Sequence, residues 1–362
     1  MNRILATYRI TAPPGESRAR AEALAAEQSV EMPVAAIGDE RVLSEVVATV
    51  EDIRPHADRF EVVLGIAPAT TGHEASQLMN MLFGNCSLQP EVELVDVAFP
   101  DGYEKSFPGP RFGIEAIRAL TGAAGRPLTC SALKPLGSGV EHLASIARTF
   151  ALARIDVIKD DHGIADQSYA PFAERVPAVM RAITEANRES GGQTAYAPTF
   201  SGSARALDAQ ARIAREHGVK MALVAPMLVG VPAFVELRAE LNLPIIAHPA
   251  FAGTGRIAAP LLLGKLFRLF GADATIFPNH GGRFSLSRET CLAIAAAARA
   301  PWAGVAPILP VPAGGMSVER VAQMRATYGN DTMLLIGGGL LSAGDRLLEK
   351  SREFVESVRR AS

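Results

Sequence analysis

Four ionisable side chains follow an apolar run in the segment IDVIKDDHG (155–163). Lys159, Asp160, Asp161 and His162 come where a buried strand would end. Mg²⁺ is a hard cation that prefers oxygen ligands, and Asp161 can supply one while His162 can supply a nitrogen. A lysine ammonium cannot bind a cation, so Lys159 is either a neighbouring charge or chemically modified. The cluster predicts a divalent metal site, and the alternative is a solvated charged turn.

Other polar and glycine-rich positions follow apolar runs in the same way. They are Lys134, His248, Asn279, His280, Gly314, Gly315 and Gly337–Gly339. A single lysine or histidine at such a place is usually solvated or packed, and glycine pairs are common in turns. Together, however, these residues fall at the carboxyl ends of successive strands, where catalytic side chains gather in a parallel barrel. Their shared position favours one functional site.

The two glycine clusters indicate a phosphate site. Backbone N–H groups approach a phosphate closely only where no side chain intervenes. In (β/α)₈ barrels, phosphate sites recur in the loops after strands seven and eight, where Gly314-Gly315 and Gly337–Gly339 fall. Ser317 can cap the following helix and offer an N–H or a hydroxyl group. The pattern predicts a phosphorylated small-molecule substrate.

The elements that position these residues alternate regularly from about residue 127. Amphipathic stretches such as 141–153 and 204–217 separate eight short apolar runs. The runs span 127–135, 155–163, 193–200, 221–226, 244–251, 274–279, 305–315 and 331–340. Near-continuous apolar strands indicate a parallel sheet, and eight strand–helix units indicate an α/β protein with a closed (β/α)₈ TIM barrel. An open doubly wound sheet is the alternative, but it usually has fewer strands and a glycine-rich turn after the first.

Residues 1–110 show a different pattern, which predicts a smaller α+β domain of ferredoxin-like type. Strands are expected at 4–10, 59–66 and 91–97, helices at 15–28 and 73–82, and a mixed stretch at 41–51. Residues 102–113 contain three glycines and two prolines and are the expected linker. The barrel, as the catalytic domain, is expected to span 111–362.

The composition argues against several classes of protein. The 362 residues have a formal net charge of −2 and 48% hydrophobic residues, and they lack the clustered positive charge typical of a nucleic-acid surface. No long uncharged apolar run predicts a membrane span, and Met1–Arg9 does not resemble a signal peptide. Cys86, Cys130 and Cys291 show no CxxC spacing, so we expect neither a zinc site nor disulfides. A cytoplasmic location with reduced thiols is expected.

Several motifs occur in an order that is specific in combination. They are AAEQSV (25–30), LFGNCSL (82–88), FPGPRFGI (107–114), GRPLTCSALKPLG (125–137), DVIKDDHG (156–163), AHPAF (247–251), PAGGM (312–316) and LIGGGL (335–340). By these motifs the chain resembles the RuBisCO superfamily, and specifically its non-carboxylating form IV, the RuBisCO-like proteins. The resemblance covers nearly the whole chain. It implies an α+β domain followed by a barrel, and a homodimer, or a larger assembly of dimers, with shared active sites.

The resemblance also implies roles for residues of the metal site. The lysine that matches Lys159 is typically carbamylated by carbon dioxide in this superfamily, and the anionic carbamate binds Mg²⁺ together with the residue that matches Asp161. His162 falls where the carboxylases carry a glutamate, which changes that donor from oxygen to nitrogen. Lys134 matches the lysine that serves in enolisation.

Further roles follow from the same resemblance. Asn85 and Glu27 match active-site residues that the neighbouring subunit supplies. His248 matches a barrel histidine near the substrate, and the glycine clusters match the backbone phosphate site. His280 and Arg283 are expected beside that phosphate site.

Three departures from the carboxylases argue against carbon fixation. The loop NHGGRFSLS (279–287) lacks the lysine that carboxylases need, and Arg283 is its one cation. Pro249 replaces an arginine that holds a second phosphate, and Leu136 replaces the second lysine of the usual KPK motif. The loss of that arginine indicates a substrate with one phosphate, not two.

The expected activity is Mg²⁺-dependent proton abstraction next to a carbonyl group of a phosphorylated ketose. The first candidate is isomerisation of 5-methylthioribulose 1-phosphate. Decarboxylation of 3-oxo-isoapionate 4-phosphate comes second, and enolisation of 2,3-diketo-5-methylthiopentyl 1-phosphate third. An apolar pocket for a methylthio group can come from Met227, Phe251, Phe277 and Phe284. A non-catalytic binding or regulatory protein is the remaining alternative, against which the retained lysines and aspartate argue.

Overall fold

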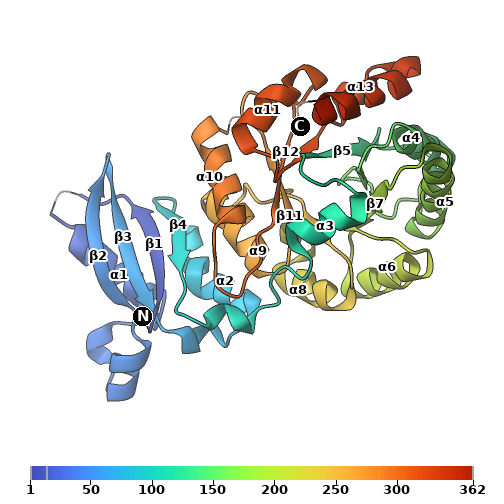
Figure 1. Cartoon of the computed structure of the whole chain (residues 1–362). Helices are drawn as coiled ribbons and strands as arrows, with labels where there is room; N and C mark the ends of the chain where they lie inside the picture. Colours follow the sequence, from blue (N-terminus) through green and yellow to red (C-terminus); the bar gives the residue numbers. More distant parts are fainter. Residues whose placement is uncertain (1, 14, 285, 361–362) are drawn as a thin grey trace. The chain divides into compact units, whose positions relative to one another are not determined.

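The structure is a computed structural model that describes residues 2–13, 15–284 and 286–360. It forms two compact units: Met1–Pro108 with Ala252–Leu262, and Gly109–Phe251 with Leu263–Ser362 (Figure 1). Residues 252–262 thus belong to the first unit, although their sequence position lies inside the expected barrel range. The reason is backbone pairing, because Leu94 N–H donates to Arg256 O and Ala258 N–H donates to Leu94 O.

The first unit is a four-stranded antiparallel sheet with two main helices. In chain order the elements are β1 (Ile4–Ile10), α1 (Ser17–Glu27), β2 (Thr49–His56), β3 (Arg59–Ile66), α2 (Ala75–Phe83) and β4 (Val92–Ala98). The short turns are η1 (Val34–Ala36), η2 (Val42–Val46), η3 (Pro68–Thr71), η4 (Asn85–Leu88) and η5 (Tyr103–Ser106). The sheet order is β2-β3-β1-β4, which is the ferredoxin-like arrangement that the sequence predicts. Strand β2 was not predicted, because its solvent-exposed residues give no clear alternation.

The second unit is a barrel of parallel strands. They are β5 (Leu128–Leu133), β6 (Val157–Asp160), β7 (Ala195–Ala197), β8 (Thr199–Phe200), β9 (Ala222–Val224), β10 (Ile245–Ala247), β11 (Ala274–Pro278), β12 (Leu309–Ala313) and β13 (Met333–Leu335). The hydrogen-bonded orders are β13-β5-β6-β7 and β8-β9-β10-β11-β12. Pro198, which has no N–H group, separates β7 from β8 within the third predicted strand. The Thr332 hydroxyl donates to Pro310 O at 3.0 Å, linking the segments of β12 and β13, so the predicted (β/α)₈ barrel is confirmed.

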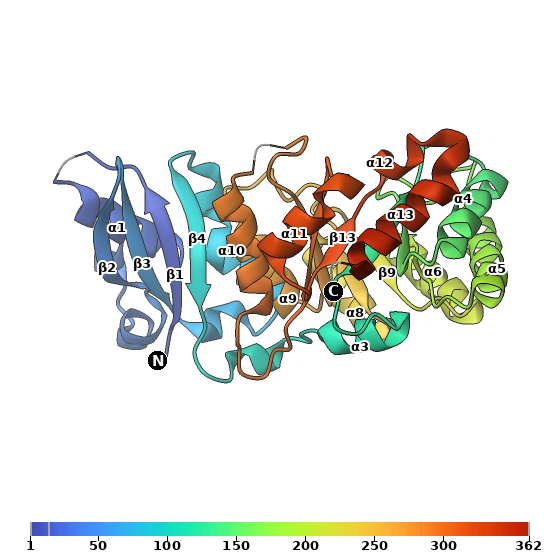
Figure 2. The same ribbon diagram turned by 45° about the horizontal axis from the view of Figure 1, so that its top comes forward.

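Helices surround the ring of strands in the second unit (Figures 1 and 2). The longer ones are α3 (Gly113–Thr121), α4 (Val140–Leu152), α5 (Phe172–Ser190), α6 (Ala204–Glu216), α8 (Val231–Glu240), α10 (Arg288–Arg299), α11 (Val321–Tyr328) and α13 (Leu347–Arg360). Shorter helical segments are α7 (Pro226–Val229), α9 (Phe267–Leu269), η7 (Val318–Arg320), α12 (Gly338–Leu341) and η8 (Gly344–Arg346), and η6 (Pro260–Leu266) crosses the boundary of the units. No helix in the described ranges is long and apolar enough to cross a membrane.

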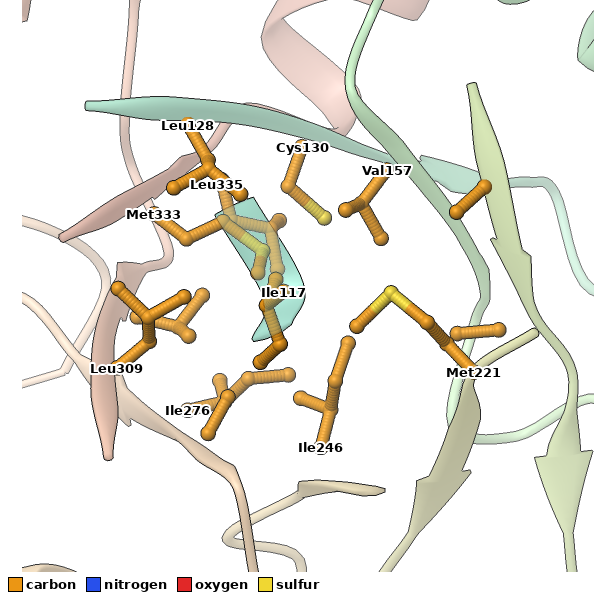
Figure 3. Packing of buried hydrophobic residues seen from close by; sticks show 14 of the residues in the cluster. Ile117, Leu128, Cys130, Val157, Met221, Ile246, Ile276, Leu309, Met333 and Leu335 are labelled. Atoms are coloured by element: carbon orange, nitrogen blue, oxygen red, sulfur yellow. The ribbon is translucent and has the colours of Figure 1, made fainter. Parts of the chain in front are cut away.

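Buried apolar side chains fill the barrel interior. Leu128, Val157, Ile246 and Leu309 belong to this cluster, and Ile117 of α3 lies among them (Figure 3). Because α3 precedes the first strand, its side chains close the barrel at the amino-terminal ends of the strands. The packed interior leaves the loops after the carboxyl ends as the place for a site.

Candidate active site

The Asp161 carboxylate is the centre of a charged cluster at the ends of β5 and β6. These strands are neighbours, with Leu133 opposite Asp160, so the residues that follow them come together. Lys134 Nζ lies 2.7 Å from Asp161 Oδ1, and His162 Nδ1 lies 3.6 Å from the same oxygen. The structure therefore brings Lys134, which the sequence singled out after a different strand, together with Asp161 and His162.

Lys159 lies just before this cluster and is almost fully buried, with 3% of its surface exposed. Its Nζ donates to Asp160 O at 2.9 Å. Burial lowers the pKa of Lys159, and the negative charge of Asp161 offsets only part of this effect. A lowered pKa increases the fraction of free amine, which is the form that reacts with carbon dioxide.

The two carboxylates of the cluster have different environments. Burial opposes ionisation of Asp161, but hydrogen bonds from His162 and Lys134, together with the charge of Lys159, hold its pKa below the usual range. Asp160 is fully buried and accepts hydrogen bonds from Arg175 Nε at 3.2 Å, the Tyr196 hydroxyl at 2.6 Å and Thr199 N–H at 3.0 Å. Asp161 is therefore available for chemistry, whereas Asp160 is committed to the fold.

His248, which follows β10, joins the cluster by stacking on His162. The two ring centroids are 4.2 Å apart and the planes differ by 12°. Burial lowers the pKa of His248 to about 2, and the nearby charge of Lys159 adds to the effect. Its Nδ1 accepts the Ala250 N–H at 3.1 Å, so the neutral ring carries its proton on Nε2. His248 thus offers a neutral N–H donor.

A metal ion would need a further donor at this cluster. Within the described ranges, no group of three or more His, Cys, Asp and Glu side chains is arranged to hold one. Asp161 and His162 supply two donors, and a carbamate on Lys159 would supply the third. The side chains present therefore fit Mg²⁺ only if Lys159 is modified.

The loops after β11 and β12 touch backbone to backbone. Gly314 and Gly315 have φ angles of 79° and 71°, which favour glycine. A Cβ on Gly315 would lie 2.6 Å from Gly282 Cα, and one on Gly282 would lie 2.1 Å from Gly314 O. Side chains at Gly282 or Gly315 would force the two loops apart.

Arg320 of η7, which the sequence did not single out, holds the same two loops together. Its Nη2 donates to His280 O at 3.1 Å, and its Nη1 donates to Gly315 O at 3.4 Å. The predicted His280 and Arg283 are thereby placed beside the first glycine cluster. No side-chain pattern could reveal Arg320, because its acceptors are backbone carbonyl groups.

The second glycine cluster lies beside Lys134. A Cβ on Gly337 would be 3.7 Å from Lys134 Cε, and one on Gly339 would be 2.9 Å from Met316 O. The loop after β13, which also contains Gly338, therefore packs against the loop after β12. Both clusters line the rim that holds Lys134.

Gly315→Ala should weaken substrate binding, because the new methyl group would collide with Gly282 backbone that cannot move aside freely. We expect KM for a phosphorylated substrate to rise at least about tenfold, equivalent to about 1.4 kcal/mol. Gly218→Ala is the matched control, since Gly218 has a φ of 67° but nothing within 4 Å of its Cβ position. Equal KM values for the two variants would contradict the prediction.

Glu27 and Asn85 lie in the first unit. Asn85 Nδ2 donates to Glu27 Oε1 at 2.9 Å, so the structure brings these two predicted residues together. Their contribution to a neighbouring subunit's site stays a prediction.

The large exposed apolar side chains of the second unit all lie in segments that follow the carboxyl ends of barrel strands. Leu136, Tyr169, Leu228, Phe251 and Phe284 follow β5, β6, β9, β10 and β11, respectively. Phe277, expected in an apolar pocket, is instead fully buried and packs edge-on against Tyr328. Because Ala274 and Ile276 of β11 face the barrel interior, the side chain of Phe277 faces the surrounding helices, so the expectation for Phe277 was wrong.

Comparisons with known proteins agree with this arrangement. Residues 113–276 match the family model described as the ribulose bisphosphate carboxylase large chain, catalytic domain. The chain is 53% identical over 360 residues to a 5-methylthioribulose-1-phosphate isomerase of Rhodospirillum rubrum, covering 99% of this chain and 96% of the relative. It is 36% identical over 290 residues to a 2,3-diketo-5-methylthiopentyl-1-phosphate enolase of Geobacillus kaustophilus, covering 78% and 70% of the two chains.

A solved structure shows the same fold along the whole chain. It is the crystal structure of a Rubisco-like protein from Rhodopseudomonas palustris, with a TM-score of 0.93 and 49% sequence identity. The alignment covers 99% of this chain and 98% of that one. The chain therefore belongs to the RuBisCO large-chain superfamily and, within it, to the RuBisCO-like proteins.

Proposed function

We propose that the protein is a Mg²⁺-dependent 5-methylthioribulose-1-phosphate isomerase. The observation that carries the proposal is the convergence of Lys134, Lys159 and Asp161 beside the glycine loops. The glycine loops can bind a phosphate group, and the charged cluster can bind a carbonyl group of the same substrate. The 53% identity to a relative named for this reaction supports the choice of substrate.

The proposed chemistry begins with positioning by the chain itself. Backbone N–H groups of the two glycine clusters bind the phosphate, which places the sugar carbons beside Lys134. Asp161, His162 and carbamylated Lys159 would hold Mg²⁺, which when bound supplies Lewis-acid polarisation of the carbonyl group.

A base beside the carbonyl group then moves the proton. Either the Lys159 carbamate or Lys134 removes it from the carbon next to the carbonyl, and the proton returns to another carbon to give the isomer. The Nε2–H group of His248 is available to stabilise negative charge that develops on a substrate oxygen.

The exposed apolar side chains that follow the barrel strands support a substrate with one phosphate and an apolar tail. A Cβ on Gly163 would lie 3.4 Å from a Leu136 methyl carbon and 4.0 Å from Asp161 Oδ2, so Leu136 lies close to the charged cluster. Phe251 has a φ of 67°, which is unusual for a bulky residue, and 60% of its surface is exposed. Exposed apolar groups held at a site favour a methylthio group over a second phosphate.

The second candidate is the enolase reaction on 2,3-diketo-5-methylthiopentyl 1-phosphate, which the 36% identical relative favours. A substrate panel with Mg²⁺ and bicarbonate in D₂O, followed by proton and phosphorus NMR, separates the candidates. Deuterium in a new ketose phosphate supports the isomerase. Turnover of the diketone alone supports the enolase, and carbon dioxide release from 3-oxo-isoapionate 4-phosphate alone supports a decarboxylase. The absence of turnover with all three substrates would overturn the proposed activity.

Phe251→Ser should impair use of the methylthio sugar, since it removes apolar surface from the proposed tail site. We expect KM to rise about 5- to 30-fold, which corresponds to the loss of roughly 1–2 kcal/mol of apolar contact. Leu43→Ser is the control, because Leu43 is an exposed apolar residue of the first unit. Steady-state kinetics would contradict the tail site if both variants kept the wild-type KM.

A further inference from the structure

A polar cavity lies at the end of the barrel where the strands begin, opposite the candidate active site. Its volume is about 170 Å³. Ile155 and Asp156 precede β6, and Gln193 and Thr194 precede β7, whereas the candidate active site follows the other ends of the strands. The cavity is therefore separate from the site described above.

Positive charge predominates around this cavity. The described residues that line it include Arg126, Arg154 and Arg359, against a single carboxylate, Asp156. Three guanidinium groups against one carboxylate leave a surplus of two positive charges. The cavity has the charge to receive a dianion.

Asp156 is already fully engaged by one of the three arginines. Arg126 Nη1 and Nη2 donate to its two oxygens at 2.7 Å each, and Thr129 N–H donates to it at 2.7 Å. Both partners are buried, with exposed fractions of 9% for Arg126 and 4% for Asp156. This pair forms a fixed polar wall, and neither Arg154 nor Arg359 forms an ion pair with Asp156.

Arg154 and Arg359 carry the surplus charge. The Arg154 side chain donates to Gly191 O at 3.2 Å, and the Arg359 guanidinium has no hydrogen-bond or ion-pair partner among residues 2–13, 15–284 and 286–360. The pKa of Arg359 is lowered, first by burial and then by repulsion from Arg126 and Arg154, and the charges of Asp156 and Glu356 offset only part of this effect. The guanidinium groups therefore repel one another across the cavity.

The backbone at Arg154 is also unusual. Its φ is 64°, in the left-handed region where glycine is favoured, although it follows helix α4 as a helix-terminating residue. A Cβ on Gly192 would lie 3.5 Å from Arg154 Cγ, so the arginine stem packs over that glycine. This packing holds the Arg154 side chain among the residues that line the cavity.

We propose that this cavity is an anion site that binds the phosphate group of a small phosphorylated metabolite or inorganic phosphate. Arg154 and Arg359 supply the charge, and Arg126 and Thr194 complete the polar lining. A volume of about 170 Å³ exceeds the share of several water molecules, at about 30 Å³ each, and so accommodates a phosphate group. Because the site lies at the far rim, the proposal does not depend on the proposed isomerase activity.

Calorimetric titration with inorganic phosphate at constant ionic strength tests the site. We expect wild-type protein to bind two phosphates per chain, one at each rim. Arg154→Gln/Arg359→Gln should weaken one binding event at least about tenfold, whereas Gly315→Ala should weaken the other. Arg352→Gln is the matched control, because Arg352 is exposed on the same helix α13 but does not line the cavity.

The outcomes separate binding from a merely structural role. If the arginines only stabilise helix ends, the double variant will lower Tm in chloride yet bind phosphate like Arg352→Gln, and the proposal fails. Arg359→Gln alone serves if the double variant does not fold, because no described residue pairs with Arg359. Competition by glycerol 3-phosphate would identify a phosphomonoester site, and its absence would restrict the site to inorganic phosphate.

Discussion

Lys159→Ala is expected to lower kcat/KM at least about 1,000-fold, because the change removes both a proposed metal ligand and a candidate base. Lys159 lies two residues before Asp161 and is almost fully buried, so its loss leaves the proposed metal site without its third donor. The loss should exceed that from His248→Ala, which removes one neutral donor. Steady-state turnover of 5-methylthioribulose 1-phosphate, with and without bicarbonate, measures the effect.

Two controls make this result specific. Lys220→Ala removes an exposed lysine that precedes β9 at the other rim, and it should leave turnover unchanged. Wild-type activity should rise with bicarbonate and Mg²⁺ together, whereas Lys159→Ala should respond to neither. A Lys159→Ala protein that keeps wild-type activity, or bicarbonate-independent activity in the wild type, would exclude the carbamate.

The barrel and the rim of the site could be predicted from the sequence because both depend on local patterns. Apolar runs mark parallel strands, and the residues that end those runs must share one rim. The association of Lys134, Asp161 and His162 followed from this rule alone. Strand β2 could not be predicted, because its exposed residues show no clear alternation, although it forms a local hairpin with β3. The pairing of 252–262 with β4 could not either, because it depends on a contact between segments distant in the sequence.

The sequence also does not reveal that Asp160 and Asp161 have different functions. Two adjacent aspartates are chemically identical in the sequence. Because successive side chains at the end of β6 point in opposite directions, the two carboxylates have different neighbours. Asp160 meets Arg175 and Tyr196, whereas Asp161 meets Lys134. Only the three-dimensional packing assigns one carboxylate to the fold and the other to chemistry.

Arg175→Met should produce the largest loss of stability of any single change proposed. Arg175 and Asp160 are both fully buried, with Arg175 Nη2 3.1 Å from Asp160 Oδ2. Removing the cation leaves an unpaired buried carboxylate, which typically costs about 3–5 kcal/mol. In urea unfolding, the transition of the barrel should therefore give a free energy of unfolding that is lower than that of the wild type by about this amount.

Arg148→Met provides the comparison, because Arg148 pairs with Glu189 at 2.6 Å with 40% and 57% of the side chains exposed. An exposed pair of this kind contributes at most about 1 kcal/mol. Asp160→Leu/Arg175→Met should recover part of the loss, since it removes both charges together. If Arg175→Met costs no more than Arg148→Met, the buried pair is not what fixes the backbone between Lys159 and Asp161. The position of the candidate metal ligands would then have to depend on the strand pairing of β5 with β6.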